Sequence, residues 1–371
     1  MPEAAGNIQI AEVRLPSTDL NDDLFFYTKT LGFRLEVIFP ADDPAIAVLS
    51  GYGLRIRLER GATEAPGTLK LLCRDPDGLA NGQRVLTAPN GTRIELDESD
   101  PPLVMPETKH AFIVRRLKDK TPWVIGRAGM QYRDLVPGRL GGTIIASHIR
   151  IPDAGPVPDM VHYHTVGFQL IFCYRGWVQL VYEDQGPPFK LKAGDCVIQP
   201  PEIRHRVLES SENLQVIEIG VPAEHVTTID HEMDLPTGVV NPDRDFSGQK
   251  FCRHEVEEAT WEPWRLEGFE VRETGIGAAT GGVASVQVAR STGNGTESVS
   301  SHNSDILFTF VMEGRMTLRG EGQDAHTLTA GDAYVIPPNM KTSITDRSDD
   351  LEVLEVSIPG TFETIVHERG S

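Results

Sequence analysis

The sequence predicts a mainly β protein built from many short strands and few helices. Its 371 residues include 35 Gly and 26 Pro, many of them in turn-like clusters between short apolar runs. Within these runs apolar and polar residues often alternate, which is typical of strands that bury one face. Apolar residues make up 39% of the chain, enough for packed cores in two or three domains.

The charge balance limits the classes of partner. Acidic residues outnumber basic ones by 54 to 35, which gives a formal net charge of −19 and would repel the phosphates of nucleic acid. The N-terminal segment has no basic start and no apolar run, and no stretch approaches the roughly 20 apolar residues that span a bilayer. The four cysteines are scattered and lack CxxC spacing, so we expect them to be buried, reduced thiols. We therefore expect a cytoplasmic protein that binds neither nucleic acid nor a membrane.

Residues 1–100 predict a small α+β domain. A strand is expected over 8–15, followed by a helix within 16–33 that Ser17, Thr18 or Asp19 can cap and Gly32 can end. Leu20, Leu24, Tyr27 and Leu31 fall on one stripe of that helix, which would pack on a sheet. Three further strands are expected at 34–39, 46–50 and 54–58.

This βαβββ order, with the segment FYTKTLGF, resembles one module of the glyoxalase/bleomycin-resistance (vicinal oxygen chelate) family. The segments TLKLLCRDPDG and PNGTRIELDE look like the start and end of a truncated second module. The resemblance implies metal positions on the outer strands of each module, which match Glu12, Glu59, Lys70 and Glu95. Because a protonated lysine cannot replace a histidine ligand, we expect a structural or dimerising domain without a working metal site.

Residues 161–176, VHYHTVGFQLIFCYRG, hold the strongest chemical signal. His162 and His164 are two positions apart, so they point to the same face of a strand. His205 follows in GDCVIQPPEIRH, and a returning strand would add it to the pair. Three neutral imidazoles on one side of a cavity form a site for a divalent transition metal ion.

These two blocks resemble the two motifs of the cupin family, a small antiparallel double-sheet β-barrel of the jelly-roll type. The first motif matches at His162, His164 and Gly176, and the second at Gly194, Pro200 and His205. Gln169 stands where the family has glutamate, and Glu202 where it has glycine. The resemblance implies one ion held by His162, His164, His205 and Gln169, with Fe(II) expected first and Mn, Ni, Zn or Cu as alternatives.

Two roles stay open for Gln169. Its side-chain oxygen would coordinate the ion as a neutral, weaker donor, or the side chain would swing away and hydrogen-bond the substrate. A glutamine leaves the ion about one charge more positive than a glutamate would, which favours an anionic or chelating small molecule. Glu202, beside the site, is the other candidate catalytic residue because it is the carboxylate that could act as a base.

The chain repeats itself after a polar, turn-rich connection at 221–250. FEVRETGIGAATGGVASVQV echoes MQYRDLVPGRLGGTIIASHI, and AGDAYVIPP echoes AGDCVIQPP. Gly176 and Gly314 are 138 positions apart, and Gly194 and Gly331 are 137 apart. A duplication of this length predicts two copies of one domain, at 109–235 and 250–371, so the chain resembles a bicupin.

The second copy lacks the ligand set. At the positions equivalent to the candidate ligands stand Ser300, His302, Leu307 and Thr342. One histidine with a serine, a leucine and a threonine does not hold a transition metal, so we expect one metal site per chain.

The ligand set of the first copy resembles that of cupin dioxygenases that cleave carbon–carbon bonds in aromatic diols, flavonols and diketones. The resemblance implies an Fe(II) (or other divalent metal) dioxygenase acting on a small enolisable or aromatic-diol substrate. A metal-dependent isomerase, lyase or hydrolase on the same barrel stays open, as does a non-catalytic bicupin that binds a small ligand. Because sheet edges and apolar strand faces of duplicated barrels commonly pair with another copy, we also expect a homodimer.

Overall fold

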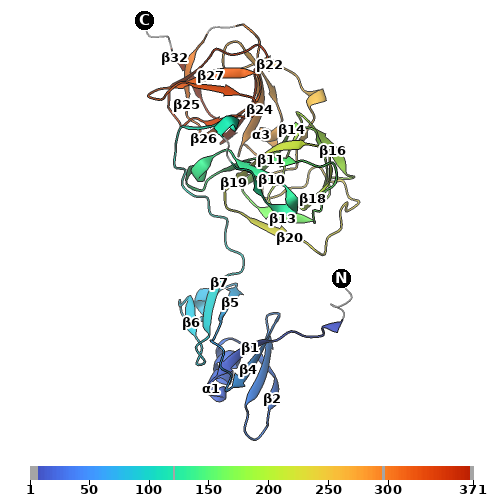
Figure 1. Ribbon diagram of the computed structural model, residues 1–371, viewed down its shortest axis with the longest axis vertical. Helices are drawn as coiled ribbons and strands as arrows, with labels where there is room; N and C mark the ends of the chain where they lie inside the picture. Colours follow the sequence, from blue (N-terminus) through green and yellow to red (C-terminus); the bar gives the residue numbers. More distant parts are fainter. Residues whose placement is uncertain (1–6, 120–121, 295–296, 368–371) are drawn as a thin grey trace. The chain divides into compact units, whose positions relative to one another are not determined.

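The computed structural model describes residues 7–119, 122–294 and 297–367. Its contacts divide the chain into two compact units, Met1–Pro102 and Leu103–Ser371. Many short strands and a few short helices make up these units, so the expectation of a mainly β protein is confirmed (Figure 1). Among the described residues, no helix combines the length and the apolar character needed to cross a membrane.

The first half of unit 1 has the order strand, helix and three strands. Its elements are β1 (Val13–Ser17), α1 (Leu20–Phe25), the π-helical turn η2 (Phe26–Thr30), β2 (Arg34–Phe39), β3 (Ile46–Gly51) and β4 (Leu54–Arg60). The sheet order is β1-β4-β3-β2, with β1 parallel to β4. The carboxylate of Asp19 caps α1 by accepting the backbone N–H of Asn21 at 2.9 Å. Leu20, Tyr27 and Leu31 of the predicted stripe are buried in the core of the unit.

The second half of unit 1 is a shorter module. It contains β5 (Thr68–Cys73), α2 (Pro76–Leu79), β6 (Val85–Thr87) and β7 (Arg93–Glu98). The three strands form a sheet in the order β5-β7-β6. The helix has only four residues because the chain turns back to β6 within a few positions. The likeness of unit 1 to the glyoxalase family stays a prediction.

The four side chains at the metal positions implied by that likeness form ion pairs with neighbouring residues. The pairs are Glu12 with Arg55 at 2.7 Å, Glu59 with Arg57 at 3.1 Å, Lys70 with Asp97 at 2.5 Å and Glu95 with Arg93 at 2.9 Å. Each pair is partly or largely exposed, so it contributes little to stability. In this structure these four side chains are therefore engaged in ion pairs with nearby strand residues.

Unit 2 contains two barrels, each built from two antiparallel sheets (Figure 1). The larger sheet of the first barrel contains, in spatial order, β21 (Arg253–His254), β17 (Cys196–Ile198), β14 (Phe168–Arg175), β19 (Leu214–Val221), β11 (Ile145–Ile151), β10 (Gln131–Asp134) and β9 (Val124–Ile125). Its smaller sheet contains β16 (Phe189–Lys192), β15 (Trp177–Tyr182), β18 (His205–Ser210), β13 (His162–Thr165) and β20 (Val226–Ile229), and β12 (Gly155–Pro156) pairs with β18.

The second barrel repeats this plan. Its larger sheet contains β22 (Glu262–Pro263), β23 (Phe269–Glu273), β24 (Ser285–Ser291), β31 (Glu352–Ile358), β26 (Ile306–Glu313), β29 (Ala333–Val335) and β8 (Ile113–Arg115). Its smaller sheet contains β28 (His326–Thr329), β27 (Arg315–Gly320), β30 (Thr342–Thr345), β25 (Val299–His302) and β32 (Thr364–His367). The short helix α3 (Ile276–Ala279) connects β23 to β24.

The two barrels exchange one edge strand each. β8 belongs by sequence to the repeat at 109–235, yet it pairs with β29 of the second barrel. β21 belongs to the repeat at 250–371, yet it pairs with β17 of the first barrel. The repeats in the sequence and the barrels in space therefore differ by one strand in each direction.

Alternation along the strands sorts side chains between the barrel interiors and the contact between barrels. Phe168 and Phe172 on β14 share a buried cluster with Phe308 and Phe310 on β26. Cys173, on the opposite face of β14, lies in a separate cluster inside the first barrel. A continuous apolar core thus joins the two larger sheets, and each barrel keeps an interior of its own.

Candidate functional site

Strand pairing brings the three predicted histidines together in the first barrel. His162 and His164 lie on β13, and His205 begins β18 directly opposite His162. Alternate residues of a strand point to one face, so the two histidines of β13 point the same way, and all three rings are buried. The ring centroids of His162 and His205 are 4.2 Å apart, and the candidate ligand atoms of the three residues lie within 4.8 Å of one another.

Hydrogen bonds decide which nitrogen of each ring is left to bind an ion. Nδ1 of His162 and Nδ1 of His205 each donate to the backbone carbonyl two positions earlier, at 2.8 and 2.9 Å. Nδ1 of His164 lies 2.8 Å from the hydroxyl oxygen of Thr227. The carbonyl acceptors leave Nε2 of His162 and of His205 as the lone-pair donor, and the same holds for His164 when its Nδ1 donates to the hydroxyl of Thr227. Nε2 of His162 is buried without a hydrogen-bond partner in the described part of the chain, a cost that a bound cation would remove.

Burial keeps these imidazoles in the neutral form. It lowers the pKa of His162, with the charge of Arg127 as the second cause. It lowers the pKa of His164 to about 2, with His162 and then His225 contributing next. It also lowers the pKa of His205 well below its ordinary value. Neutral imidazole is the form that binds a metal ion, so the donor set suits a divalent cation at neutral pH.

Gln169 is buried on β14 and is held by a carboxylate. Its Nε2 donates to Oε1 of Glu218 at 2.8 Å. A carboxylate only accepts hydrogen bonds, so the amide oxygen must point away from Glu218. That oxygen is buried and has no hydrogen-bond partner among the described residues. Coordination of an ion would use this oxygen as it stands, whereas a swing towards substrate would break the bond to Glu218.

Glu202, the candidate base, lies outside the cavity described below. It is exposed and has a φ of 62°, a left-handed conformation that suits the glycine of the cupin motif. Its carboxylate accepts the hydroxyl of Thr165 at 3.4 Å, and its backbone N–H donates to the carbonyl of His164 at 3.0 Å. Glu202 therefore shapes the turn before His205, and its carboxylate is not placed to act on a substrate in the barrel.

A cavity with an empty volume of about 570 Å³, its open mouth included, lies beside His164 and His205. Its walls are mostly apolar and consist of Met130, Ile149, Ile151, Ile171, Val178, Leu180, Val207, Leu214 and Val216. The remaining lining residues are polar: Arg127, Tyr132, Gln199 and Glu218. An apolar cavity with a few polar groups is the usual form of a small-molecule site.

Arg127 and Glu218 bring one charge of each sign to this cavity. Arg127 forms an ion pair with the buried carboxylate of Asp159, whose second oxygen accepts the backbone N–H of Val207 at 2.9 Å. Burial, and next the charge of Glu218, raise the pKa of Tyr132 to about 12. Tyr132 therefore remains a neutral phenol that can donate a hydrogen bond.

Arg127 and Glu218 are not predicted as site residues from the sequence, because neither lies in the two motif blocks. The internal repeat carried a signal for both. Arg265 stands 138 positions after Arg127, and Glu355 stands 137 positions after Glu218, the same offsets that relate the motif glycines. The chain thus kept an arginine and a glutamate in both copies while the metal ligands changed.

In the second barrel, the residues that stand at the positions of the candidate ligands lie together as the ligands do in the first barrel. Ser300 on β25 pairs directly with Thr342 on β30, as His162 pairs with His205. His302 and Leu307 line the same cavity as this pair. In the part of the chain that the structure describes, the histidine triad of the first barrel is the one group of His, Cys, Asp or Glu side chains at metal-binding spacing.

Comparison with known proteins agrees with this architecture. No protein-family model matches the chain, and no curated protein matches it significantly. Salicylate 1,2-dioxygenase from Pseudaminobacter salicylatoxidans is similar in structure, with a TM-score of 0.51 and 17% sequence identity over 71% of this chain and 90% of that chain. A variant of that enzyme in complex with gentisate has a TM-score of 0.52 and 16% identity over 72% and 88% of the two chains. At this identity the likeness shows the fold alone, and that fold is the cupin fold.

Proposed function

We propose that this chain is a metal-dependent dioxygenase that cleaves a carbon–carbon bond in a small enolisable or aromatic-diol substrate. The observation that carries the proposal is the set of three buried, neutral imidazoles whose Nε2 atoms are left to bind an ion beside an apolar cavity. We assign His162, His164 and His205 as ligands of one divalent ion, with Gln169 as a weaker oxygen donor. Fe(II) is the proposed ion, and Mn, Ni, Zn or Cu would suit the same nitrogen donors.

The other cavity residues have roles that follow from their chemistry. When bound, the ion supplies electrophilic and redox chemistry that these side chains lack. Arg127 would bind an anionic oxygen of the substrate, since a guanidinium has further donors beyond those that face Asp159. We propose Glu218, which lines the cavity, in place of Glu202 as the group that accepts a proton from an acidic hydroxyl or C–H group. The apolar walls exclude water and strengthen these polar interactions.

The similar solved structures support the choice of reaction class by analogy only. Salicylate 1,2-dioxygenase is named for an aromatic substrate, and one of its variants was solved with gentisate. Both molecules carry neighbouring oxygens and a carboxylate. A cavity with Arg127 at its lining suits that chemistry, so gentisate and salicylate belong in the first panel of substrates to be tested.

Metal content is the first test. Elemental analysis of the protein purified without added metal is expected to find about one ion per chain. His162→Ala should retain almost none, whereas His231→Ala, which removes an exposed histidine outside the cavity, should retain the full amount. A wild-type protein that stays metal-free after incubation with Fe(II) would overturn the proposal.

Oxygen uptake is the second test, and it separates the proposed activity from its alternatives. The panel contains gentisate, salicylate, a catechol and a β-diketone, each with the Fe(II)-loaded protein. Uptake that requires both the ion and one of these substrates supports a dioxygenase. Turnover without oxygen would indicate an isomerase, lyase or hydrolase instead. Tight binding of these molecules without turnover would indicate a non-catalytic binding protein.

We also propose that the chain forms a homodimer. The edge strands β9 and β32 carry the apolar side chains Val124, Ile125, Ile365 and Val366, which are between 55% and 73% exposed. Unpaired edges of this kind commonly pair with another copy. Light scattering at several protein concentrations tests this proposal, and a mass of one chain at all of them would contradict it.

A further inference from the structure

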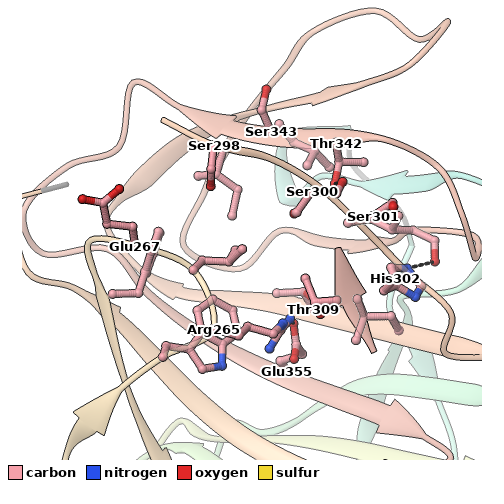
Figure 2. Close-up of a pocket in the computed structure, with 18 of the residues that line it drawn as sticks. Arg265, Glu267, Ser298, Ser300, Ser301, His302, Thr309, Thr342, Ser343 and Glu355 are labelled. Atoms are coloured by element: carbon pink, nitrogen blue, oxygen red, sulfur yellow. Dashed lines mark hydrogen bonds and ion pairs between the residues drawn. The ribbon is translucent and has the colours of Figure 1, made fainter. Parts of the chain in front are cut away.

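The second barrel has lost the metal ligands, but it keeps an open cavity in their place (Figure 2). The empty volume is about 620 Å³ with the mouth included, close to that of the cavity in the first barrel. Ser300, Leu307 and Thr342, which replace three of the four candidate ligands, all line it. A barrel that had become purely structural would be expected to fill this space with apolar side chains. The cavity has instead acquired a polar lining.

Hydroxyl groups are the main feature of that lining. They belong to Ser298, Ser300, Ser301, Thr309, Tyr334, Thr342, Ser343 and Thr364. Figure 2 shows Ser298, Ser300 and Thr342 along one side of the cavity and Arg265, Thr309 and Glu355 on the other, while the side chain of Ser343 points away from them. A hydroxyl both donates and accepts hydrogen bonds, so a wall of hydroxyls matches a ligand that carries several hydroxyls of its own.

His302 adds a buried acceptor to the cavity. Its side chain is only 5% exposed, and Nε2 donates to the carbonyl of Ile336 at 3.2 Å. Burial lowers the pKa of His302 to about 4, so the ring is neutral and Nδ1 carries a lone pair. Nδ1 is buried and has no hydrogen-bond partner in the described part of the chain. A hydroxyl donor from a ligand would satisfy such a buried acceptor.

The charges that line the cavity cancel, which argues against a charged ligand. Arg265 pairs with Glu355, and the other two charged residues of the lining are Arg347 and Glu267. In the first barrel Glu218 accepts a hydrogen bond from the neutral side chain of Gln169. In the second barrel Leu307 stands at the position equivalent to Gln169, and Glu355, equivalent to Glu218, forms an ion pair with Arg265 instead. Glu355 itself lines this cavity, whereas Asp159, the partner of Arg127, does not line the cavity of the first barrel, so a carboxylate ligand here would have to compete with Glu355 for the guanidinium of Arg265.

Aromatic side chains complete the cavity. Trp264 and Phe269 line it, and the guanidinium of Arg265 lies over the ring of Trp264 at 4.0 Å. The guanidinium of Arg347 likewise lies over the ring of Phe269 at 4.8 Å, so one face of each ring is covered. The part of each ring that lines the cavity offers an apolar surface to the C–H groups of a ligand, while hydroxyls on the other wall reach its oxygens.

We propose that the second barrel binds a small, uncharged polyol or monosaccharide. Thr342 and Ser300 would hydrogen-bond its hydroxyls, His302 would accept from one of them, and Trp264 and Phe269 would cover its apolar face. The site is for binding, and no bond of the ligand is broken there. It does not depend on the metal site of the first barrel.

Saturation-transfer NMR on the full chain tests this proposal. The probes are glycerol, D-xylose, D-glucose and myo-inositol, with gluconate and glucuronate as charged analogues of similar size. We expect saturation transfer to at least one uncharged probe and weaker transfer to the charged analogues. Transfer to none of the uncharged probes, or stronger transfer to the carboxylates, would overturn the proposal.

Variants assign the binding to the second barrel. Thr342→Val keeps the shape of the side chain and removes one hydroxyl, so the affinity for the bound probe should fall by roughly tenfold. Thr345→Val makes the same change on the same strand at a buried position outside the cavity lining, and it should leave the affinity unchanged. Ser300→Ala is a second variant of the cavity and should also weaken binding.

A further control separates this proposal from the proposed dioxygenase function. His162→Ala should bind the polyol as the wild type does, because the metal site lies in the other barrel. Loss of polyol binding in His162→Ala, or unchanged binding in both Thr342→Val and Ser300→Ala, would place the ligand elsewhere and sink the proposal. Failure of the metal tests alone leaves this binding result standing.

Discussion

Arg272 of the second barrel donates two hydrogen bonds, each of 3.1 Å, to the carbonyl oxygen of Gly194 in the first barrel. The relationship is reciprocal, because Arg133 of the first barrel donates to the carbonyl oxygen of Gly331 in the second. Both arginines are only 1% exposed, and each glycine begins the second motif of its own copy. Each barrel thus fixes a turn that leads into the second motif of the other.

This contact predicts that Arg272 couples the stability of the barrels. Arg272→Met keeps much of the apolar bulk but leaves the carbonyl of Gly194 without its donor, so the free energy of unfolding should fall by about 2 kcal/mol. Urea denaturation followed by tryptophan fluorescence measures the change. The control Arg290→Met removes an arginine whose side chain is 44% exposed, and it should cost less than about 1 kcal/mol. Equal losses in the two variants would contradict the coupling.

The pair of Gln169 and Glu218 makes a prediction about charge. In the wild type the amide nitrogen of Gln169 donates to the carboxylate of Glu218 at 2.8 Å. Gln169→Glu replaces this amide with a second carboxylate at the same short distance, so one of the two carboxyl groups must have a raised pKa. A carboxyl whose folded-state pKa is raised contributes stability below its unfolded value of about 4.3. That stability is lost as pH rises through the raised value. We therefore expect the metal-free Gln169→Glu variant to be less stable than wild type at pH 8 and closer to it at pH 5.

The double variant Gln169→Glu with Glu218→Gln is the matched control for this effect. It exchanges donor and acceptor, which restores one amide and one carboxylate at the two positions. Thermal unfolding of the metal-free proteins should show most of the lost stability recovered at pH 8. A double variant as unstable as the single one would mean that the Gln169–Glu218 bond is not the cause.

His148 predicts a loss of stability in acid. Burial, and next the charge of Arg133, lower the pKa of His148 to about 4. The unfolded chain has the ordinary value of 6.5, so below that pH it takes up a proton that the folded state refuses. Stability should fall as pH decreases from 6.5 towards 4. His148→Gln should remove about 2 kcal/mol of this loss between pH 7 and pH 4.5, measured by urea denaturation at both values. Equal pH dependence in variant and wild type would exclude His148 as the source.

The cysteines predict an unreactive native protein. All four are free thiols, and burial raises the pKa of Cys173 to about 12 and also raises the pKa of Cys196 and Cys252. Only the thiolate reacts rapidly. Titration with a disulfide reagent at pH 8 should therefore modify Cys173 and Cys196 only after denaturation, when all four thiols become available. Rapid modification of four thiols in the native protein would contradict this.

Much of this architecture was predictable from the sequence because it depends on local patterns. His162 and His164 share a face through strand alternation, and spacing to Gly194 and His205 identified the returning strand. The repeat offset matched Ser300 to His162 and Thr342 to His205, and the strand register pairs Ser300 with Thr342 as it pairs the two histidines. Asp19 and Gly32 mark the ends of the helical segment because capping and left-handed closure are local properties as well.

The features of the site that could not be predicted from the sequence depend on contacts between residues far apart in the chain. The nearness of Glu202 to His205 in the chain predicts a base beside the site, but Glu202 is exposed and is not among the residues that line the cavity. Glu218 is 49 residues from Gln169, and only the pairing of β14 with β19 brings the two together. The exchange of β8 and β21 was also hidden, since two or three residues of edge strand carry no pattern that names their partner.

The strand exchange has an evolutionary consequence for a duplicated gene. A deletion that removes either repeat also takes an edge strand from the barrel that remains, because β21 completes the sheet of the metal-site barrel and β8 that of its counterpart. Selection that maintains the metal-site barrel therefore also maintains the second repeat, because that repeat supplies β21. Its outer framework is constrained, while the side chains that point into its interior are free to diverge and acquire a different ligand.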